Sequence, residues 1–240
     1  LFLGNLLLAQ TPVDRVYPYL DAANSRWFFF SSASRPFGMV NLSPDTEIGG
    51  AWGSGYRYNT EEIKGFSHIH AWQLAGVSIM PVAKDKLDKN TIKNIAKDYY
   101  SAFSHDKEIV KPGYHKVFLE RYNTTVELTS TKRVGMHKLD FPDSTSNAVL
   151  VNLGGKLGPS EIIHGELKQV SDNELTGMVM SGKTMRRPKD TPVYFCIQFN
   201  ANIKGLHSFK KENINKIVGK DNGAIVVLNT NGQPLLMKVG

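Results

Sequence analysis

Aromatic rings, histidines and glycines gather in one stretch of the chain, residues 36–80, where Trp52, Tyr56, Tyr58, His68 and His70 lie close together in sequence. Glycines punctuate this stretch, and a backbone without side chains can approach a ligand closely. Flat rings beside fixed polar groups suit a sugar ring, whose C–H faces are apolar and whose rim carries hydroxyls. The stretch therefore predicts one wall of a carbohydrate pocket.

Trp52 is the strongest candidate for contact with the sugar, together with its neighbours Gly53 and Ser54. Four glycines lie within three residues of Trp52, and a loop so rich in glycine suits a pocket rim better than a core. The alternative is a tryptophan covered by the sheets. Tyr56 and Tyr58 alternate, so they share one face of a strand, either as a cross-strand aromatic pair or as binding residues.

His68 and His70 would point to one face if His68-Ile69-His70 were a strand. Two imidazoles so placed could begin a zinc site, but no third ligand follows at a defining spacing. They could also hydrogen-bond a sugar, meet a neighbouring domain, or be buried structural histidines. Cys196 is the single cysteine, which excludes an internal disulfide and a multi-thiolate metal site. Its apolar strand pattern predicts a buried, inert thiol.

Catalytic acids are harder to find. Glycoside hydrolysis needs two carboxyl groups that face each other across a sugar. Glu61 and Glu62 are adjacent, so they point in opposite directions on a strand, and Asp45 after Ser43-Pro44 is expected in an Asx-type turn. Asp106 and Glu108 fall in a segment typical of a solvated loop. The sequence thus predicts a site wall with no catalytic residue of its own and no metal ligands.

The elements that must position this wall are mostly strands. Alternating apolar and polar residues between turn signals predict the strands Phe37–Leu42, Val77–Val82, Tyr114–Arg121, Thr124–Ser130, Val134–Phe141, Ala148–Leu153, Glu161–Val170, Glu174–Met180, Val193–Phe199, Ala224–Asn229 and Pro234–Val239. Asn123 and Asp172-Asn173 are expected at hairpin turns. One helical pattern covers Thr91–Phe103. The fold class expected is all-β, an antiparallel sandwich of the supersandwich type with one or two short helices.

Composition limits the partners. The 240 residues are 41% hydrophobic and carry a net charge of +7, but the lysines and arginines are scattered, so a nucleic-acid partner is not expected. Leu1–Ala9 is too short to span a bilayer and no other stretch predicts a membrane helix. Residues 1–11 resemble the end of a signal peptide, which predicts an exported protein, periplasmic, extracellular or attached to the outer membrane. Residues 12–240 are expected to form one domain.

Three ordered motifs resemble the family 92 glycoside hydrolases, the exo-acting α-mannosidases. They are PFGMVNLSPDT (residues 36–46), SGYRY (54–58) and GFSHIH (65–70). The segments at residues 103–119 and 126–142 and the closing LLMKVG are similar to the same N-terminal region. The resemblance therefore runs along nearly the whole chain.

That resemblance implies a β-sandwich that precedes a larger (α/α)₆ barrel in the same polypeptide, with the present chain ending before the barrel. Family members cleave terminal α-mannosyl residues with inversion and need calcium, and the barrel supplies the acid, the base and the calcium ligands. By the same resemblance, Trp52, Gly53 and Ser54 are expected at the sugar, and His68 and His70 at or behind the pocket. The implied substrates are α-mannosides, including N-glycans. A stand-alone carbohydrate-binding module is the alternative, and a zinc-binding structural domain is a third possibility.

Overall fold

Antiparallel strands joined by tight turns make up most of the chain in the computed structural model, which describes residues 11–23, 33–50, 55–70, 74–83, 98–142, 147–209, 214–220 and 222–240. Among these residues are two short 3₁₀ helices, η1 (Pro12–Arg15) and η3 (His105–Lys107). Every strand pairing among these residues is antiparallel. The expected all-β sandwich is confirmed.

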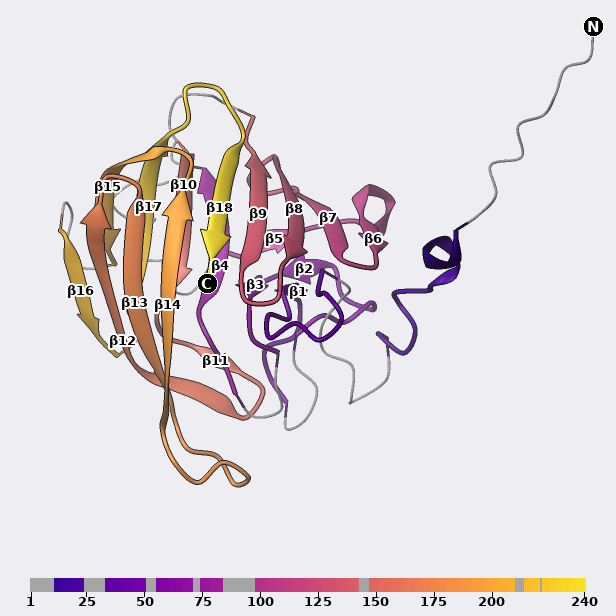
Figure 1. The fold of residues 1–240 in the computed structure, drawn as a ribbon, viewed down its shortest axis with the longest axis horizontal. Coiled ribbons are helices and arrows are strands. Elements are labelled where there is room, and N and C mark those ends of the chain that lie inside the picture. Colours follow the sequence, from indigo (N-terminus) through magenta and orange to yellow (C-terminus); the bar gives the residue numbers. More distant parts are fainter. Residues whose placement is uncertain are drawn as a thin grey trace, which may run out of the picture.

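The strands of the described residues form two large sheets and one small one (Figure 1). The six-stranded sheet runs in the order β1 (Ser43–Asp45), β3 (Gly65–Ser67), β4 (Ser78–Ala83), β10 (Asn147–Asn152), β17 (Gly223–Asn229), β15 (Asn202–Ser208). The ten-stranded sheet runs in the order β11 (Lys156–Leu157), β12 (Ser160–Ser171), β13 (Glu174–Ser181), β14 (Thr191–Phe199), β18 (Leu235–Val239), β9 (Gly135–Asp140), β8 (Thr124–Ser130), β7 (Tyr114–Leu119), β6 (Ile109–Lys111), with β16 (Lys216–Gly219) also on β12. The small sheet pairs β2 (Glu62–Ile63) with β5 (Ser101–Ala102).

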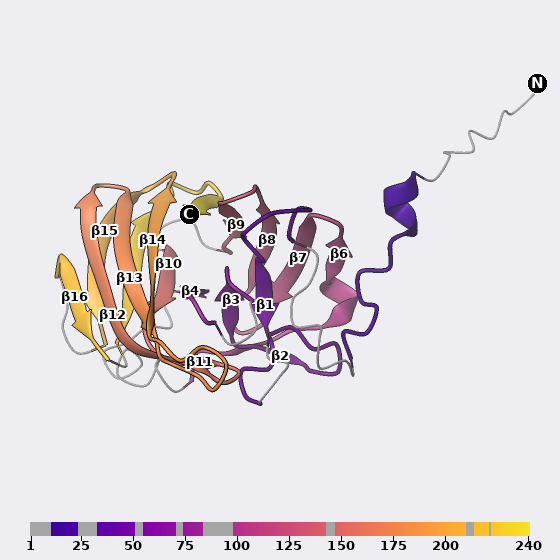
Figure 2. The ribbon, with the colours of Figure 1, turned by 60° about the horizontal axis from the view of Figure 1, so that its bottom comes forward.

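The two large sheets lie face to face, with β10, β15 and β17 layered behind β12–β14 in both views (Figures 1 and 2). Alternation along each strand sends one set of side chains into the space between them. In β8, for example, Val126 and Leu128 are buried whereas Glu127 and Thr129 are not. The middle of β10, Ala148–Val151, is apolar and buried on both faces, as expected of a strand in the middle of its sheet. The core therefore joins both sheets into one unit.

Most of the expected strands are confirmed within one or two residues of their ends, and so are both hairpin turns. Asn123 joins β7 to β8 with a φ of 48°, a left-handed conformation that asparagine tolerates better than most residues. Asp172 and Asn173 join β12 to β13.

The strand expected at Phe37–Leu42 is wrong. The Gly38 amide donates to the Arg35 carbonyl at 3.0 Å, closing a turn with Pro36 in its second position, and Phe37 has a φ of 59°. Phe37 is 97% exposed at this turn. The strand of this region is β1, which begins only at Ser43.

The helix expected at Thr91–Phe103 is also wrong in its described part, residues 98–103; the rest lies outside the described residues. Ser101 and Ala102 form β5 instead, paired with β2. Tyr99 and Phe103 are both buried from this extended segment. Their spacing of four residues indicated a helix, but both side chains reach the core from an extended segment.

Candidate functional site

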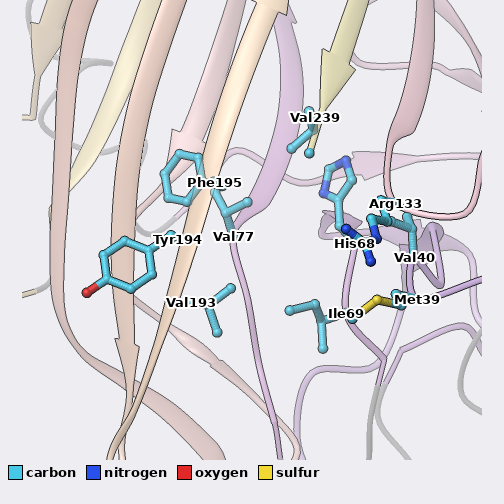
Figure 3. A pocket seen from close by; sticks show the side chains of 11 residues that line it. Met39, Val40, His68, Ile69, Val77, Arg133, Val193, Tyr194, Phe195 and Val239 are labelled. Carbon is cyan, nitrogen blue, oxygen red and sulfur yellow. The ribbon is translucent and has the colours of Figure 1, made fainter.

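A cavity of about 450 Å³ opens between the edge of the six-stranded sheet and the strands β14 and β18 (Figure 3). Mostly apolar side chains line it: Met39, Val40, His68, Ile69, Val77, Arg133, Val193, Tyr194, Phe195 and Val239, with Gly240 at its end. Such a volume and lining are typical of a small-molecule site with few polar groups. Arg133 is the charged residue in this lining and could fix the orientation of a polar ligand.

Two of the sequence motifs meet at this cavity. Met39 and Val40 come from the motif at residues 36–46, and His68 and Ile69 come from the motif at residues 65–70. The backbone joins the two motifs, because the Asn41 amide donates to the His68 carbonyl at 3.0 Å. Segments some thirty residues apart in sequence are therefore held together at one concave surface.

His68 is buried behind the cavity wall and contacts a second histidine, His137 of β9. Their Nε2 atoms lie 2.8 Å apart, so one ring donates a proton and the other accepts it. Burial lowers the pKa of His68 to about 4, which the backbone of Val77 only partly offsets, and burial together with the neighbouring His68 holds the pKa of His137 well below its usual range. Both rings are therefore neutral at pH 7, and the hydrogen bond between them joins two uncharged imidazoles.

His70 lies away from the cavity lining and has different partners. Its Nδ1 donates to the Asn41 carbonyl at 2.6 Å, and its Nε2 shares a hydrogen bond with Asp45 Oδ1 at 2.7 Å. The other oxygen of Asp45 accepts a hydrogen bond from Ser67 Oγ. This chain of buried polar groups ties the end of the histidine motif to β1, so His70 acts as a structural support.

Two expectations about these residues are corrected. Asp45 belongs to β1 and is almost wholly buried, rather than standing in an Asx turn. β3 ends at Ser67, so His68-Ile69-His70 is not a strand, and the two imidazoles contact different groups. Within the described residues, no group of three His, Cys, Asp or Glu side chains is placed to hold a metal ion.

Trp52, Gly53 and Ser54 lie outside the described residues, as does Trp72. Next to them, Gly55 pairs with Glu47 in an isolated antiparallel bridge. Of the five expected site residues, the described ones are His68, which lines the cavity, and His70, which does not. Cys196, expected to be buried, is only partly so.

The carboxylate of Glu108 is a feature that the sequence analysis missed. It was expected in a solvated loop, but its side chain is fully buried. Glu108 Oε1 accepts from His115 Nε2 at 2.7 Å, and Oε2 accepts from His105 Nδ1 at 2.6 Å, Tyr56 OH at 3.0 Å and Tyr19 OH at 3.2 Å. Burial raises the pKa of this carboxyl, but the hydrogen bonds with the two histidines and Tyr56 outweigh burial, and the pKa lies below its usual value.

This cluster shows what the two tyrosines of the motif at residues 54–58 contact. Tyr56 is buried against Glu108, and Tyr58 stacks on His105 with ring centroids 4.1 Å apart. The two tyrosines therefore join a polar and aromatic cluster below η3, and they do not line the cavity. The only sequence signal for the cluster is the spacing of three between His105 and Glu108, too common to identify it.

The described residues contain no helix long and apolar enough to cross a membrane.

Comparison with known proteins agrees with this fold. The chain resembles the family GH92 α-mannosidase BT3965 from Bacteroides thetaiotaomicron, with 26% identity and a TM-score of 0.80 over 97% of this chain and 34% of that one. The same enzyme in complex with mannoimidazole gives 25% identity and a TM-score of 0.73 over 93% of this chain and 32% of that one. The inverting mannosidase BT2199 from the same organism, at 19% identity and a TM-score of 0.70, covers 97% of this chain and 32% of its own, and it supports the fold alone.

The chain spans about a third of the length of these enzymes. None of the curated proteins matches its sequence. The family model described as the glycosyl hydrolase family 92 N-terminal domain matches residues 15–240. By that match the chain belongs to glycosyl hydrolase family 92, as its N-terminal domain.

Proposed function

We propose that this chain is the N-terminal domain of an exo-acting, inverting, calcium-dependent α-mannosidase that acts on mannose-containing glycans, including N-glycans. In this proposal the chain provides one wall of the substrate pocket and packs on a C-terminal (α/α)₆ barrel of the same polypeptide. The observation that carries the proposal is the cavity at which the motifs of residues 36–46 and 65–70 meet. Because the motifs and the concave surface coincide, the cavity is the natural place for substrate contact.

The chain's own residues would bind and orient the sugar. His68, neutral and fixed by His137, would back the pocket wall and hold it in one position without a change of charge at neutral pH. Trp52 would stack on a face of the terminal mannose, with Gly53 and Ser54 beside it. His70 would hold the motif in place through Asp45.

The barrel would provide the chemistry of bond cleavage. Inversion needs a carboxylic acid that protonates the leaving oxygen and a carboxylate that activates water on the opposite face of the ring. Calcium would supply Lewis-acid contact to the hydroxyls of the mannose. The described residues hold no cluster of metal-ligating side chains, and we assign calcium to the barrel. We also propose an exported location, for which the support is the apolar segment Leu1–Ala9.

The test compares the 240-residue chain with a longer polypeptide that continues into the barrel. The longer polypeptide should hydrolyse an aryl α-mannoside, lose activity with a calcium chelator, and release the β-anomer of mannose first in an NMR time course. The chain alone should fold and show no hydrolysis. Hydrolysis by the chain alone would contradict the proposal, and mannoside binding with no hydrolysis by either protein would favour a stand-alone binding module.

A variant in this chain tests its own contribution. In the longer polypeptide, His68→Gln should lower kcat/KM by about tenfold, because loss of the hydrogen bond to His137 lets this part of the pocket wall shift and misplaces the sugar. The control is His164→Gln, because His164 lies half-exposed on β12, outside the cavity lining. Equal activity of the two variants, with the fold of both verified by circular dichroism, would refute a role for His68.

A further inference from the structure

Two rows of side chains cross the outer face of the ten-stranded sheet where β16, β12, β13 and β14 lie side by side (Figure 1). Successive register partners make up the first row: Val218, Glu166, Met178 and Tyr194. The second row, two residues further along each strand, consists of Lys216, Lys168, Thr176 and Cys196. The residues that alternate with them, such as Leu167 and Phe195, are buried, so both rows face away from the core.

Tyr194 stands out on this face because it is 76% exposed. Its ring points away from His68 and Val239, the side chains that line the other end of the cavity (Figure 3). A second groove of about 270 Å³, which Tyr194 also lines, runs along Met178, Thr176, Glu166, Lys168 and Lys216. An exposed ring at the edge of a groove offers an apolar platform next to polar groups, which is the combination that a sugar ring fits.

The charges of this groove favour an anion. Lys168 and Lys216 are direct register partners, and like charges directly opposite each other destabilise a sheet. Lys216 is partly compensated, since its Nζ lies 3.8 Å from Glu166 Oε2. Glu166 is shared with His164, whose Nε2 lies 3.1 Å from Oε1. Lys168 has no ion-pair partner among the described residues.

We propose that this groove is an ancillary binding site for acidic saccharides, which shares only Tyr194 with the pocket of the proposed function. The sugar ring stacks on Tyr194 beside Met178, and its carboxylate or phosphate substituent lies between Lys168 and Lys216. Tyr194 and Lys168 are two strands and two residues apart, about 12 Å between their Cα atoms at the usual strand spacing and rise. The long side chain of Lys168 shortens the span that one sugar ring with a charged substituent must bridge. The anion removes the repulsion between the two lysines, which gives the acidic sugar an advantage over a neutral one.

The test is an NMR titration of the 240-residue chain with four probes: glucuronate, glucose 6-phosphate, methyl glucoside and inorganic phosphate. Glucuronate or glucose 6-phosphate should shift the amide signals of β12–β14 and β16, and the stronger of the two identifies the preferred acidic group. Methyl glucoside and inorganic phosphate should each bind at least about fivefold more weakly. If neither acidic sugar shifts these signals, or if either control probe binds as tightly, the proposal is wrong.

Variants of exposed residues sharpen the test without endangering the fold. Tyr194→Ala and Lys168→Ala should each weaken binding of the acidic sugar about tenfold. Added salt should weaken sugar binding by the Lys168→Ala variant less than it weakens sugar binding by the parent chain. Tyr17→Ala and Lys132→Ala, exposed residues elsewhere, serve as matched controls and should bind as the parent does. Because His68→Gln should also leave this titration unchanged, failure here and failure of the proposed α-mannosidase activity are separate outcomes. Equal effects of the test and control variants would overturn the assignment.

Discussion

Replacing Glu108 by glutamine tests whether the buried carboxylate holds the N-terminal part of the domain together. The substitution keeps the size and shape of the side chain but removes its charge. Four donors converge on the carboxylate, from Tyr19, Tyr56, His105 and His115. An amide has only one acceptor oxygen, so its NH₂ group must face donors that were arranged for an anion.

The expected loss follows from these contacts. A hydrogen bond to a charged group contributes about 1 kcal/mol more to stability than one between neutral groups, and four such bonds are affected. The lower cost of burying a neutral amide offsets part of this loss. We therefore expect Glu108→Gln to lower the free energy of unfolding by about 3 kcal/mol, which for a domain of this size corresponds to a fall in Tm of about 6–12 °C.

The pH dependence gives this prediction a signature. The folded pKa of Glu108 lies below the ordinary value of 4.5, so below pH 4.5 the unfolded chain takes up this proton more readily than the folded chain. Its contribution to stability is therefore complete above pH 4.5 and is lost as the pH falls through the folded pKa. In Glu108→Gln this acid-dependent part of the stability should be missing.

The assay is urea unfolding of the parent and the variants at several pH values. The matched control is Glu127→Gln, because Glu127 also binds a tyrosine and a cation, Tyr114 OH at 2.7 Å and Lys138 Nζ at 2.8 Å, but lies partly in solvent. Such a surface carboxylate should contribute about 1 kcal/mol or less. If the two variants lose the same stability, or Glu108→Gln loses none, the reasoning about the buried cluster is refuted.

Three further predictions concern the histidine pair and the β13–β14 loop. Burial lowers the pKa of His68 from 6.5 to about 4. The contribution of neutral His68 to the free energy of unfolding should therefore be complete above pH 6.5 and fall by about 3 kcal/mol between pH 6.5 and 4. A urea midpoint that stays constant across that range would contradict this. Gly135→Ala should cost about 2 kcal/mol, because its Cβ would come within 2.6 Å of His68 Cδ2; an unchanged Tm would show that the ring can move freely. Arg187→Lys should speed trypsin cleavage in residues 182–190 about tenfold, because Arg187 donates to Gly182 and Lys189 carbonyls and to Thr191 Oγ1; equal cleavage of both proteins would exclude that clamp.

The sequence predicted the strands well wherever alternation and turn residues agreed. In β8, Val126 and Leu128 alternate with polar residues, and Asn123 marks the turn before it. These signals are local, so they can be recognised without knowing the rest of the fold. The layers and the hairpins of the ten-stranded sheet follow from such local signals.

The failures have a different physical origin. Tyr99 and Phe103 have helical spacing, but the neighbouring β2 offers their segment backbone partners that a pattern cannot show. Glu108 is surrounded by polar residues in sequence, and its burial depends on His115 and on Tyr56, which is fifty-two residues away. A buried polar cluster of this kind is set by tertiary contacts, and its members are ordinary residues when considered one at a time.

The same distinction explains why the sequence indicated the region of the candidate site but not the contacts made there. Each of the three motifs contributes a residue to a buried polar arrangement: His68 with His137, His70 with Asp45, and Tyr56 with Glu108. Burying polar groups costs free energy that burying apolar groups does not. This cost applies to each of the three arrangements. Polar groups held so rigidly can keep a loop in one conformation beside a cavity, and binding energy is then not consumed in ordering it. The pair of His68 with His137, which backs the cavity, and the pair of His70 with Asp45, which holds the same motif, are therefore consistent with the proposed role of this surface in binding a sugar.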